Sequence, residues 1–251
     1  MHKICVFYSD RFLDDYDTVD CENPYRVADV YTRISDIANF EEPPSCPLED
    51  LTLCHSTRLI ESVQSDPGVF EVARLAAGGA MAAAQASLEA PSFALVRPPG
   101  HHAGFDFNGG FCFFNNIALA TRKLLATGAV RSALIVDIDL HYGNGTINIF
   151  RDEAAVQFAN IQAFTREEFF GELERAIEDA SRFDVIGCSA GFDTYIKDWG
   201  QILHTDDFSR IGYLLASSHP HLFSVLEGGY YVPDLGKNVR AYLEGILEAC
   251  S

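Results

Sequence analysis

The sequence predicts one α/β domain in which helices cover both faces of a mainly parallel sheet, a three-layer α/β/α arrangement. Short β-rich runs alternate with longer helical patterns along the chain, which is typical of wound α/β folds. Apolar runs such as residues 133–136 lack the alternation of a half-exposed strand, so they indicate strands buried on both faces. The length of 251 residues fits a single domain over residues 1–251.

Six strands and six helices are expected in order along the chain. The strands are predicted near residues 3–8, 92–96, 132–138, 155–161, 183–189 and 222–227. The helices are predicted over residues 24–39, 70–90, 114–127, 165–182, 206–218 and 235–249. The stretch from Glu41 to Pro44 is expected to be a surface loop rather than a domain boundary.

Composition and charge argue against several classes of function. Hydrophobic residues make up 48% of the chain and charged residues 22%, which permits a buried core and disfavours disorder. The net charge of −18 disfavours a nucleic-acid partner, because phosphate binding needs concentrated lysine and arginine. An acidic surface can steer a cationic substrate, although the same charge would also serve solubility alone.

The seven cysteines and the first residues of the chain favour a cytoplasmic protein. The cysteine count is odd and no Cys-x-x-Cys occurs, which disfavours a disulfide scaffold and a thiolate metal site. The first ten residues indicate a strand rather than a secretory signal, and no apolar run approaches the ~20 residues of a membrane span. Any metal site is therefore expected to use histidine and carboxylate ligands. The sequence predicts no oligomeric state.

Asp139 and His141 are the strongest metal-ligand candidates. They stand two positions apart at the end of the strand at 132–138, so their side chains point to the same side. Asp193, after the strand at 183–189, can add a third ligand, and three protein ligands leave a position open, as a catalytic zinc site requires. Asp137 faces away from the metal and can orient a histidine or bind a second cation. The plainer alternative is that Asp137 and Asp139 cap loops or a helix N-terminus.

Candidate catalytic groups follow two further strands. His101 and His102 come after a rigid turn, where one can act as general base and acid and the other can tune the local charge. Tyr230 follows Gly229, whose flexibility lets a substrate approach, and its phenol can donate to a developing oxyanion. Tyr231 is the competing candidate for the role of Tyr230. The alternative for His101 and His102 is that they are loop histidines without a function.

The segment at 109–116 combines glycines with aromatic side chains. Gly110 permits a sharp turn, and Phe111 can wall a narrow channel. The alternative is that these aromatic residues pack the core beside the next helix.

Five segments, in order, resemble the histone deacetylase superfamily, which includes the acetylpolyamine amidohydrolases. They are RPPGHHA (97–103), GFCFFNN (110–116), VDIDLHYGNGT (136–146), SAGFD (189–193) and LEGGY (226–230). Weaker similarity occurs at ENPYR (22–26) and CHS (54–56). The resemblance covers nearly the whole chain and implies the arginase/deacetylase fold. It also implies that a metal-activated water hydrolyses an N-acylated amine, such as acetyl-lysine or an acetylated polyamine.

The resemblance implies a role for each candidate residue. It implies Zn2+ at Asp139, His141 and Asp193, with Fe2+ as an alternative ion. It implies that His102 is the general base and then acid, and that His101 is its electrostatic partner. In the same resemblance, Asp137 orients His101 and helps to hold a structural K+, and Asn144 is the partner of His102. Tyr230 polarises the acyl carbonyl, and Phe111, beside Gly110, is a channel wall. Arg26 lies beneath the site.

The segment at 158–165 departs from the pattern of the family. Members usually carry a long loop there with a second channel aromatic, whereas this chain passes almost directly into a helix. A channel wall is therefore either missing or supplied otherwise, with Phe164 as a candidate. The segment at 54–68 is also short, so a wider and shallower mouth is expected. Asn160 stands where a serine usually serves the potassium site, and Tyr142 replaces a common histidine.

Two other functions are weighed against deacylation. A binding or regulatory protein that has lost turnover is disfavoured, because the residues of the implied reaction are all present. Arginase-like chemistry on two manganese ions would need an Asp-x-His-x-Asp pattern. The chain has Asp137-x-Asp139-x-His141 instead, which suits one catalytic metal.

Overall fold

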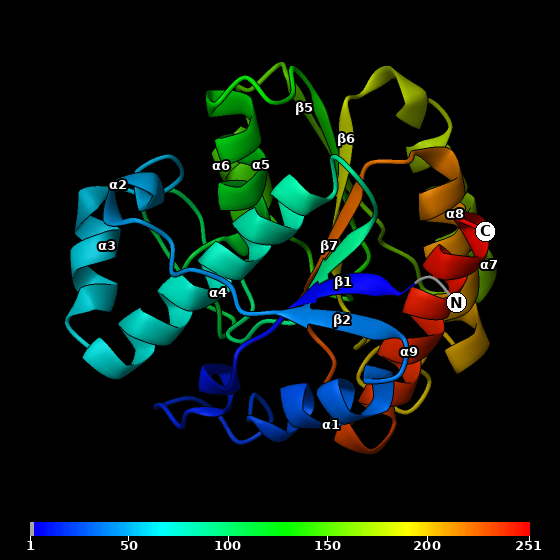
Figure 1. Ribbon diagram of the computed structural model, residues 1–251, viewed down its shortest axis with the longest axis horizontal. Helices are drawn as coiled ribbons and strands as arrows, with labels where there is room; N and C mark the ends of the chain where they lie inside the picture. Colours follow the sequence, from blue (N-terminus) through cyan, green and yellow to red (C-terminus); the bar gives the residue numbers. More distant parts are fainter. Residues whose placement is uncertain (1–2) are drawn as a thin grey trace.

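The computed structural model describes residues 3–251, and its central feature is one seven-stranded sheet within that range (Figure 1). The strands are β1 (Ile4–Phe7), β2 (Ala38–Glu41), β3 (Ser92–Ala94), β4 (Ala133–Asp137), β5 (Val156–Asn160), β6 (Val185–Ala190) and β7 (Leu222–Leu226). Their order is β2-β1-β3-β7-β6-β4-β5, and every neighbouring pair is parallel. The predicted α/β class with a parallel central sheet is confirmed.

Helices cover both faces of this sheet, which gives the three predicted layers. The helices are α1 (Tyr25–Ile34), α2 (Leu48–Leu51), α3 (Thr57–Gln64), α4 (Pro67–Ala86), α5 (Asn116–Ala126), α6 (Asn144–Phe150), α7 (Arg166–Ile177), α8 (Thr205–Ser218) and α9 (Val232–Ala249). Helices α4 and α5 cover one face, and α1, α8 and α9 cover the other (Figure 1). None of the helices in residues 3–251 has the length and apolar character that crossing a bilayer requires.

Local chemistry explains where the main elements begin. Every residue of β4 is buried, as expected for a strand covered on both faces. Helix α4 begins with Pro67 after Asp66, whose side chain accepts the N–H groups of Gly68 and Val69.

Four strand ends that carry candidate residues are brought together by the strand order. Strands β3, β7, β6 and β4 are consecutive across the sheet. All strands run in the same direction, so their carboxyl ends lie at one edge of the sheet, where sites form in such folds. Residues far apart in the sequence therefore meet above the centre of the sheet.

The prediction of a helix over 24–39 is wrong at its C-terminal end. Helix α1 ends at Ile34, and Ala38–Glu41 forms edge strand β2, in which Ala38 pairs with Ile4 of β1. A four-residue edge strand is stabilised by its neighbour in the sheet, which no local pattern reveals. Pro43, expected in a surface loop, is buried.

Helices α2, α3 and α6 were not predicted, because each spans at most eight residues. The helix predicted over 165–182 is also too long. Helix α7 ends at Ile177, and the 3-10 helix η2 (Ala180–Arg182) follows it.

Candidate active site

Three metal-ligand candidates converge at the carboxyl ends of β4 and β6. Asp139 and His141 follow β4, and Asp193 follows β6, the neighbouring strand. Each can offer one ligand atom such that these atoms all lie within 4.8 Å of one another. Nδ1 of His141 lies 3.2 Å from Oδ1 of Asp139 and 2.9 Å from Oδ2 of Asp193. Two carboxylates and an imidazole thus surround one point, a donor set that zinc accepts.

The charge and bonding of this triad fit a divalent cation. Both carboxylates are buried, and Oδ2 of Asp193 has no hydrogen-bond donor within the described residues, because its contact with His141 lies outside hydrogen-bond geometry. Hydrogen bonding to Asp139 and the nearby carboxylate of Asp193 raise the pKa of His141 to about 10. Burial, with the charge of Asp139, raises the pKa of Asp193 to about 7. A buried carboxylate oxygen without a hydrogen-bond donor needs a nearby positive charge, which a divalent cation would supply.

His101 is a buried histidine held between carboxylates. Its Nδ1 lies 3.0 Å from Oδ2 of Asp137, and its Nε2 lies 3.7 Å from Oδ1 of Asp139. Burial alone would lower the pKa of His101, but the charges of Asp139 and Asp137 outweigh burial and hold the pKa well above its usual value. The structure therefore places a positive charge next to His102, whose ring centroid is 4.1 Å away.

His102 is half-buried and oriented by Asn144. Nδ1 of His102 lies 2.7 Å from Oδ1 of Asn144, and an amide oxygen only accepts, so Nδ1 carries the proton and Nε2 keeps a free lone pair. Burial and the charge of His101 lower the pKa of His102. The rings of His102 and His141 are 5.9 Å apart. A neutral imidazole beside the triad is the state that a general base requires.

Tyr230, and not Tyr231, lies at the site. Its ring meets Phe111 edge-on at 5.8 Å, and the guanidinium of Arg26 lies 4.8 Å from its centroid. Burial raises the pKa of Tyr230 far above its usual value, so the phenol is a hydrogen-bond donor. Arg26 donates to the carbonyl oxygen of Gly229 (2.7 Å), where φ is +123°. Tyr231 packs against the loop that follows β6 instead.

The glycine-aromatic turn lies directly against the histidines. A Cβ on Gly110 would come within 2.3 Å of Cδ2 of His102, and φ is +56° at this position. Only glycine tolerates both the close approach and the left-handed backbone. The next residue, Phe111, is also left-handed, with φ of +67°. The turn thereby brings Phe111 beside Tyr230.

Two buried glutamates beneath the site had no role assigned from the sequence. Oε2 of Glu227 accepts the N–H groups of Gly100 (2.6 Å) and His101 (3.1 Å). Burial raises the pKa of Glu227 to about 7. Oε1 of Glu22 accepts from Arg26 (3.2 Å) and from Arg97 (2.9 Å). Glu22 and Arg26 stand only four residues apart, but the other contacts join segments that are distant in the sequence, so no local pattern could have identified them.

The wall expected from Phe164 is absent, and a different aromatic residue lies at the site. Phe164 is 96% exposed because its short segment leads directly into α7, so of the two alternatives, a substitute wall from Phe164 is wrong, and a missing wall stays a prediction. Trp199 instead stacks on Tyr230 with ring centroids 4.3 Å apart. The one signal that could have identified it is that Trp199 is the single tryptophan of the chain, shortly after Asp193.

Asn160, which stands where a serine usually serves the potassium site, forms a hydrogen bond within the chain. Its Oδ1 accepts the N–H of Gly143 (2.7 Å), and its Nδ2 is buried without a partner in the described residues. The side-chain oxygen already has a donor, so this contact gives no support for an ion at Asn160.

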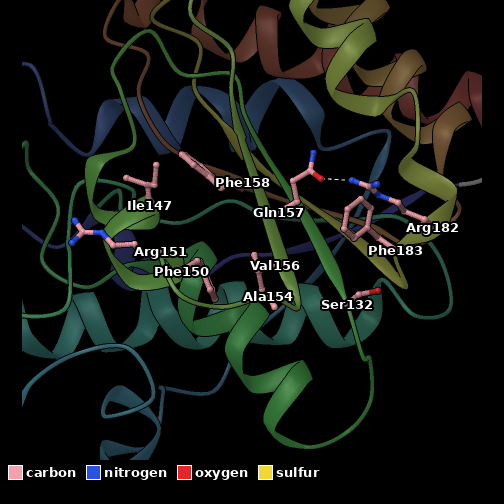
Figure 2. Close-up of a pocket in the computed structure, with 10 residues that line it drawn as sticks. All are labelled: Ser132, Ile147, Phe150, Arg151, Ala154, Val156, Gln157, Phe158, Arg182 and Phe183. Carbon is pink, nitrogen blue, oxygen red and sulfur yellow. Dashed lines mark hydrogen bonds between the residues drawn. The ribbon is translucent and has the colours of Figure 1, made fainter.

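A separate hollow of about 600 Å³ lies along edge strand β5 (Figure 2). Apolar side chains such as Phe150 and Phe158 line it together with Arg151 and Arg182. Arg182 donates to Gln157 across the hollow. None of the lining residues is a candidate site residue, so the hollow is distinct from the metal triad.

Comparison with known proteins identifies the family. The histone deacetylase domain model matches residues 20–182. A probable deacetylase from Methanothermobacter thermautotrophicus is 31% identical over 260 residues, covering 82% of this chain and 78% of that protein. An acetylpolyamine amidohydrolase from Mycoplana ramosa is 34% identical over 220 residues, covering 72% of this chain and 64% of that protein. The chain thus spans less than two thirds of the second relative.

Structural comparison gives the same fold. The crystal structure of an acetylpolyamine aminohydrolase from Burkholderia pseudomallei matches with a TM-score of 0.87 at 22% identity. The match covers 98% of this chain and 99% of that chain. The chain therefore belongs to the histone deacetylase family and is a hydrolytic enzyme of that family.

Proposed function

We propose that the protein is a zinc-dependent deacylase that hydrolyses the amide of an N-acylated amine, with Fe2+ as the alternative ion. The observation that supports this is the position of the His102 ring, 5.9 Å from the ring of His141, beside the triad of Asp139, His141 and Asp193. A divalent cation held by these three residues would polarise the amide carbonyl and acidify a water molecule for attack.

The residues around the triad supply the proton transfers. Nε2 of His102 takes a proton from the attacking water, while its Nδ1–H remains bonded to Asn144. The phenol of Tyr230 donates a hydrogen bond to the carbonyl oxygen as that oxygen gains negative charge. His102 then gives its proton to the departing nitrogen, and the C–N bond breaks to leave a carboxylate and a free amine. His101, oriented by Asp137, stabilises the negative charge that develops.

The substrate that we propose is a small or cationic N-acylated amine, either acetyl-lysine or an acetylated polyamine. The printed names of several relatives, acetylpolyamine amidohydrolases, support this class. The net charge of −18 favours attraction of cations. The exposure of Phe164 supports a wide, shallow mouth on the β5 side of the site.

The proposal is tested by metal analysis and by assays on acetyl-lysine peptides, longer acyl-lysine peptides and acetylated polyamines. We expect one Zn2+ per chain and turnover of at least one substrate. His102→Ala should lower kcat by about 100-fold or more, because it removes the base. His221→Ala, which alters a histidine bonded to the backbone of Asp184, should retain activity. A protein that binds no metal and turns over no substrate would contradict the proposal.

A further inference from the structure

The loop at 194–204, between β6 and α8, carries a buried carboxylate bonded to the backbone near the site. Oδ2 of Asp198 accepts the N–H groups of Tyr230 (2.6 Å) and Tyr231 (2.7 Å). Oδ1 accepts the N–H of Trp199 (2.8 Å). Hydrogen bonds to a charged acceptor are roughly twice as strong as neutral ones. Asp198 therefore ties this loop to the turn that presents the Tyr230 phenol.

The hydrogen bonds of Asp198 hold the side chain of Trp199 at the site. Its indole stacks on Tyr230 at 4.3 Å with 23° between the planes, and it meets His141 edge-on at 5.7 Å and 90°. Its side chain is still 49% exposed. The indole thus contacts both the phenol that would hold the carbonyl oxygen and a metal-ligand candidate. An acyl group attached to that carbonyl would begin next to the indole.

The backbone of the loop holds Trp199 in place. The N–H of Gly200 donates to the carbonyl oxygen of Asp193 (2.8 Å), and a Cβ on Gly200 would come within 2.8 Å of Cα of Thr194. The N–H of Ile196 donates to the carbonyl oxygen of Leu203 (2.7 Å). Because the loop is anchored on both sides of Trp199, the shape of the indole can discriminate between substrates.

We propose that Trp199, positioned by Asp198, is the specificity-determining wall of the site. The indole limits the space beside Tyr230 and His141, so a short acyl group such as acetyl fits and a longer linear acyl group is disfavoured. This inference rests on the proposed deacylase function and adds the acyl-length preference to it. The short segment that carries exposed Phe164 supplies no comparable wall.

Steady-state kinetics on acetyl-lysine and hexanoyl-lysine peptides test the wall. In Trp199→Ala, the ratio of kcat/KM for hexanoyl over acetyl should rise at least tenfold, and in Trp199→Phe it should rise less. Phe164→Ala is the matched control, because it removes an exposed aromatic ring from the other loop, and its ratio should stay within twofold of wild type. An unchanged ratio in Trp199→Ala, or an equal rise in Phe164→Ala, would overturn the proposal.

The positioning role of Asp198 has its own test. Asp198→Asn should lower kcat about tenfold with KM within twofold, and it should shift the emission of Trp199, the single tryptophan. In a Tyr230→Phe background the same change should lower kcat no further, because Asp198 acts through Tyr230. If the losses of kcat in Asp198→Asn and Tyr230→Phe add up in the double variant, Asp198 does not act by positioning Tyr230. If thermal melting shows that Asp198→Asn is unfolded, Trp199→Ala, which leaves the carboxylate in place, decides the proposal.

Binding without turnover separates this inference from the proposed function. In zinc-loaded His102→Ala protein, Trp199 emission can follow titration with each acyl-lysine peptide. Tighter binding of the acetyl peptide supports the wall, and equal binding of both peptides overturns it. Discriminating binding by a wild-type protein that hydrolyses neither of these peptides nor an acetylated polyamine would contradict the deacylase proposal and leave the wall supported.

Discussion

At the scale of single residues, the bond between His102 and Asn144 sets the pH range of the proposed base. An amide partner stabilises the protonated imidazole less than a carboxylate would, and burial with the charge of His101 already lowers the pKa of His102. The base is active when it is unprotonated, so the acid limb of kcat/KM should lie below the ordinary histidine pKa of about 6.5.

Asn144→Asp should move that acid limb to higher pH by about one unit or more, because a carboxylate stabilises the imidazolium form. The measurement is kcat/KM against pH for both proteins. Gln162→Glu, which adds the same charge at an exposed position, is the control and should leave the limb in place. A limb that stays at the wild-type pH in Asn144→Asp would show that another group controls it.

His141 makes metal binding depend on pH in a defined direction. Its pKa of about 10 in the metal-free protein means that it is protonated at pH 8, whereas a ligating imidazole must be neutral. Zinc binding at pH 8 should therefore release about one proton, and affinity should rise about tenfold per pH unit as pH increases toward 10. Calorimetry in two buffers of different ionisation enthalpy measures the proton. Zinc binding without proton release would contradict this assignment.

At the scale of elements, glycines set the distance between α8 and α9. A Cβ on Gly245 of α9 would come within 2.0 Å of the carbonyl oxygen of Ser209 in α8. A Cβ on Gly212 of α8 would come within 2.1 Å of the carbonyl oxygen of Tyr242 in α9. Backbone atoms of packed helices cannot move aside independently, so each glycine permits a close helix crossing.

Gly245→Ala should lower the free energy of unfolding by about 3 kcal/mol, the upper range for overpacking. Gly171→Ala in α7 is the matched control. Its added Cβ would meet only the end of Arg175, at 3.6 Å, and it should raise stability by about 0.5–1 kcal/mol through helix propensity. Urea unfolding measures both changes. Equal effects of the two variants would show that the crossing tolerates a side chain.

At the scale of the whole molecule, the buried Glu22 joins four parts of the fold. Its carboxylate accepts from Tyr16 (2.8 Å), from Arg26 of α1 and from Arg97 after β3. Arg26 continues the network to the carbonyl oxygen of Gly229 after β7. The network links the N-terminal segment to the turn that presents the phenol at the site.

Glu22→Gln should lower the free energy of unfolding by about 3–5 kcal/mol, because it leaves two buried guanidinium groups without their counter-charge. Glu244→Gln removes an exposed partner of Arg240 and should cost less than about 1 kcal/mol. Chemical denaturation compares the two variants. A loss as small as that of the exposed pair would show that Arg26 and Arg97 are satisfied by backbone carbonyls alone.

Patterns that are local in the chain determined the class of the sheet, most of its strands and the residues at the strand ends. Runs such as residues 133–136 reveal burial on both faces, and Asp139 and His141 share a side because of the two-residue strand period. The order of the motifs was enough to propose Asp193 as the third ligand. These features need no knowledge of distant contacts.

Only the tertiary structure decided how the site is bounded and supported. Edge strand β2, the Glu22 network and the stacking of Trp199 on Tyr230 each depend on neighbours far away in the sequence. A local pattern records the periodicity of a segment but not which distant side chain comes to lie against it. The metal triad could therefore be proposed from the sequence, whereas the wall beside it required the packing of the loop after β6 on the turn after β7.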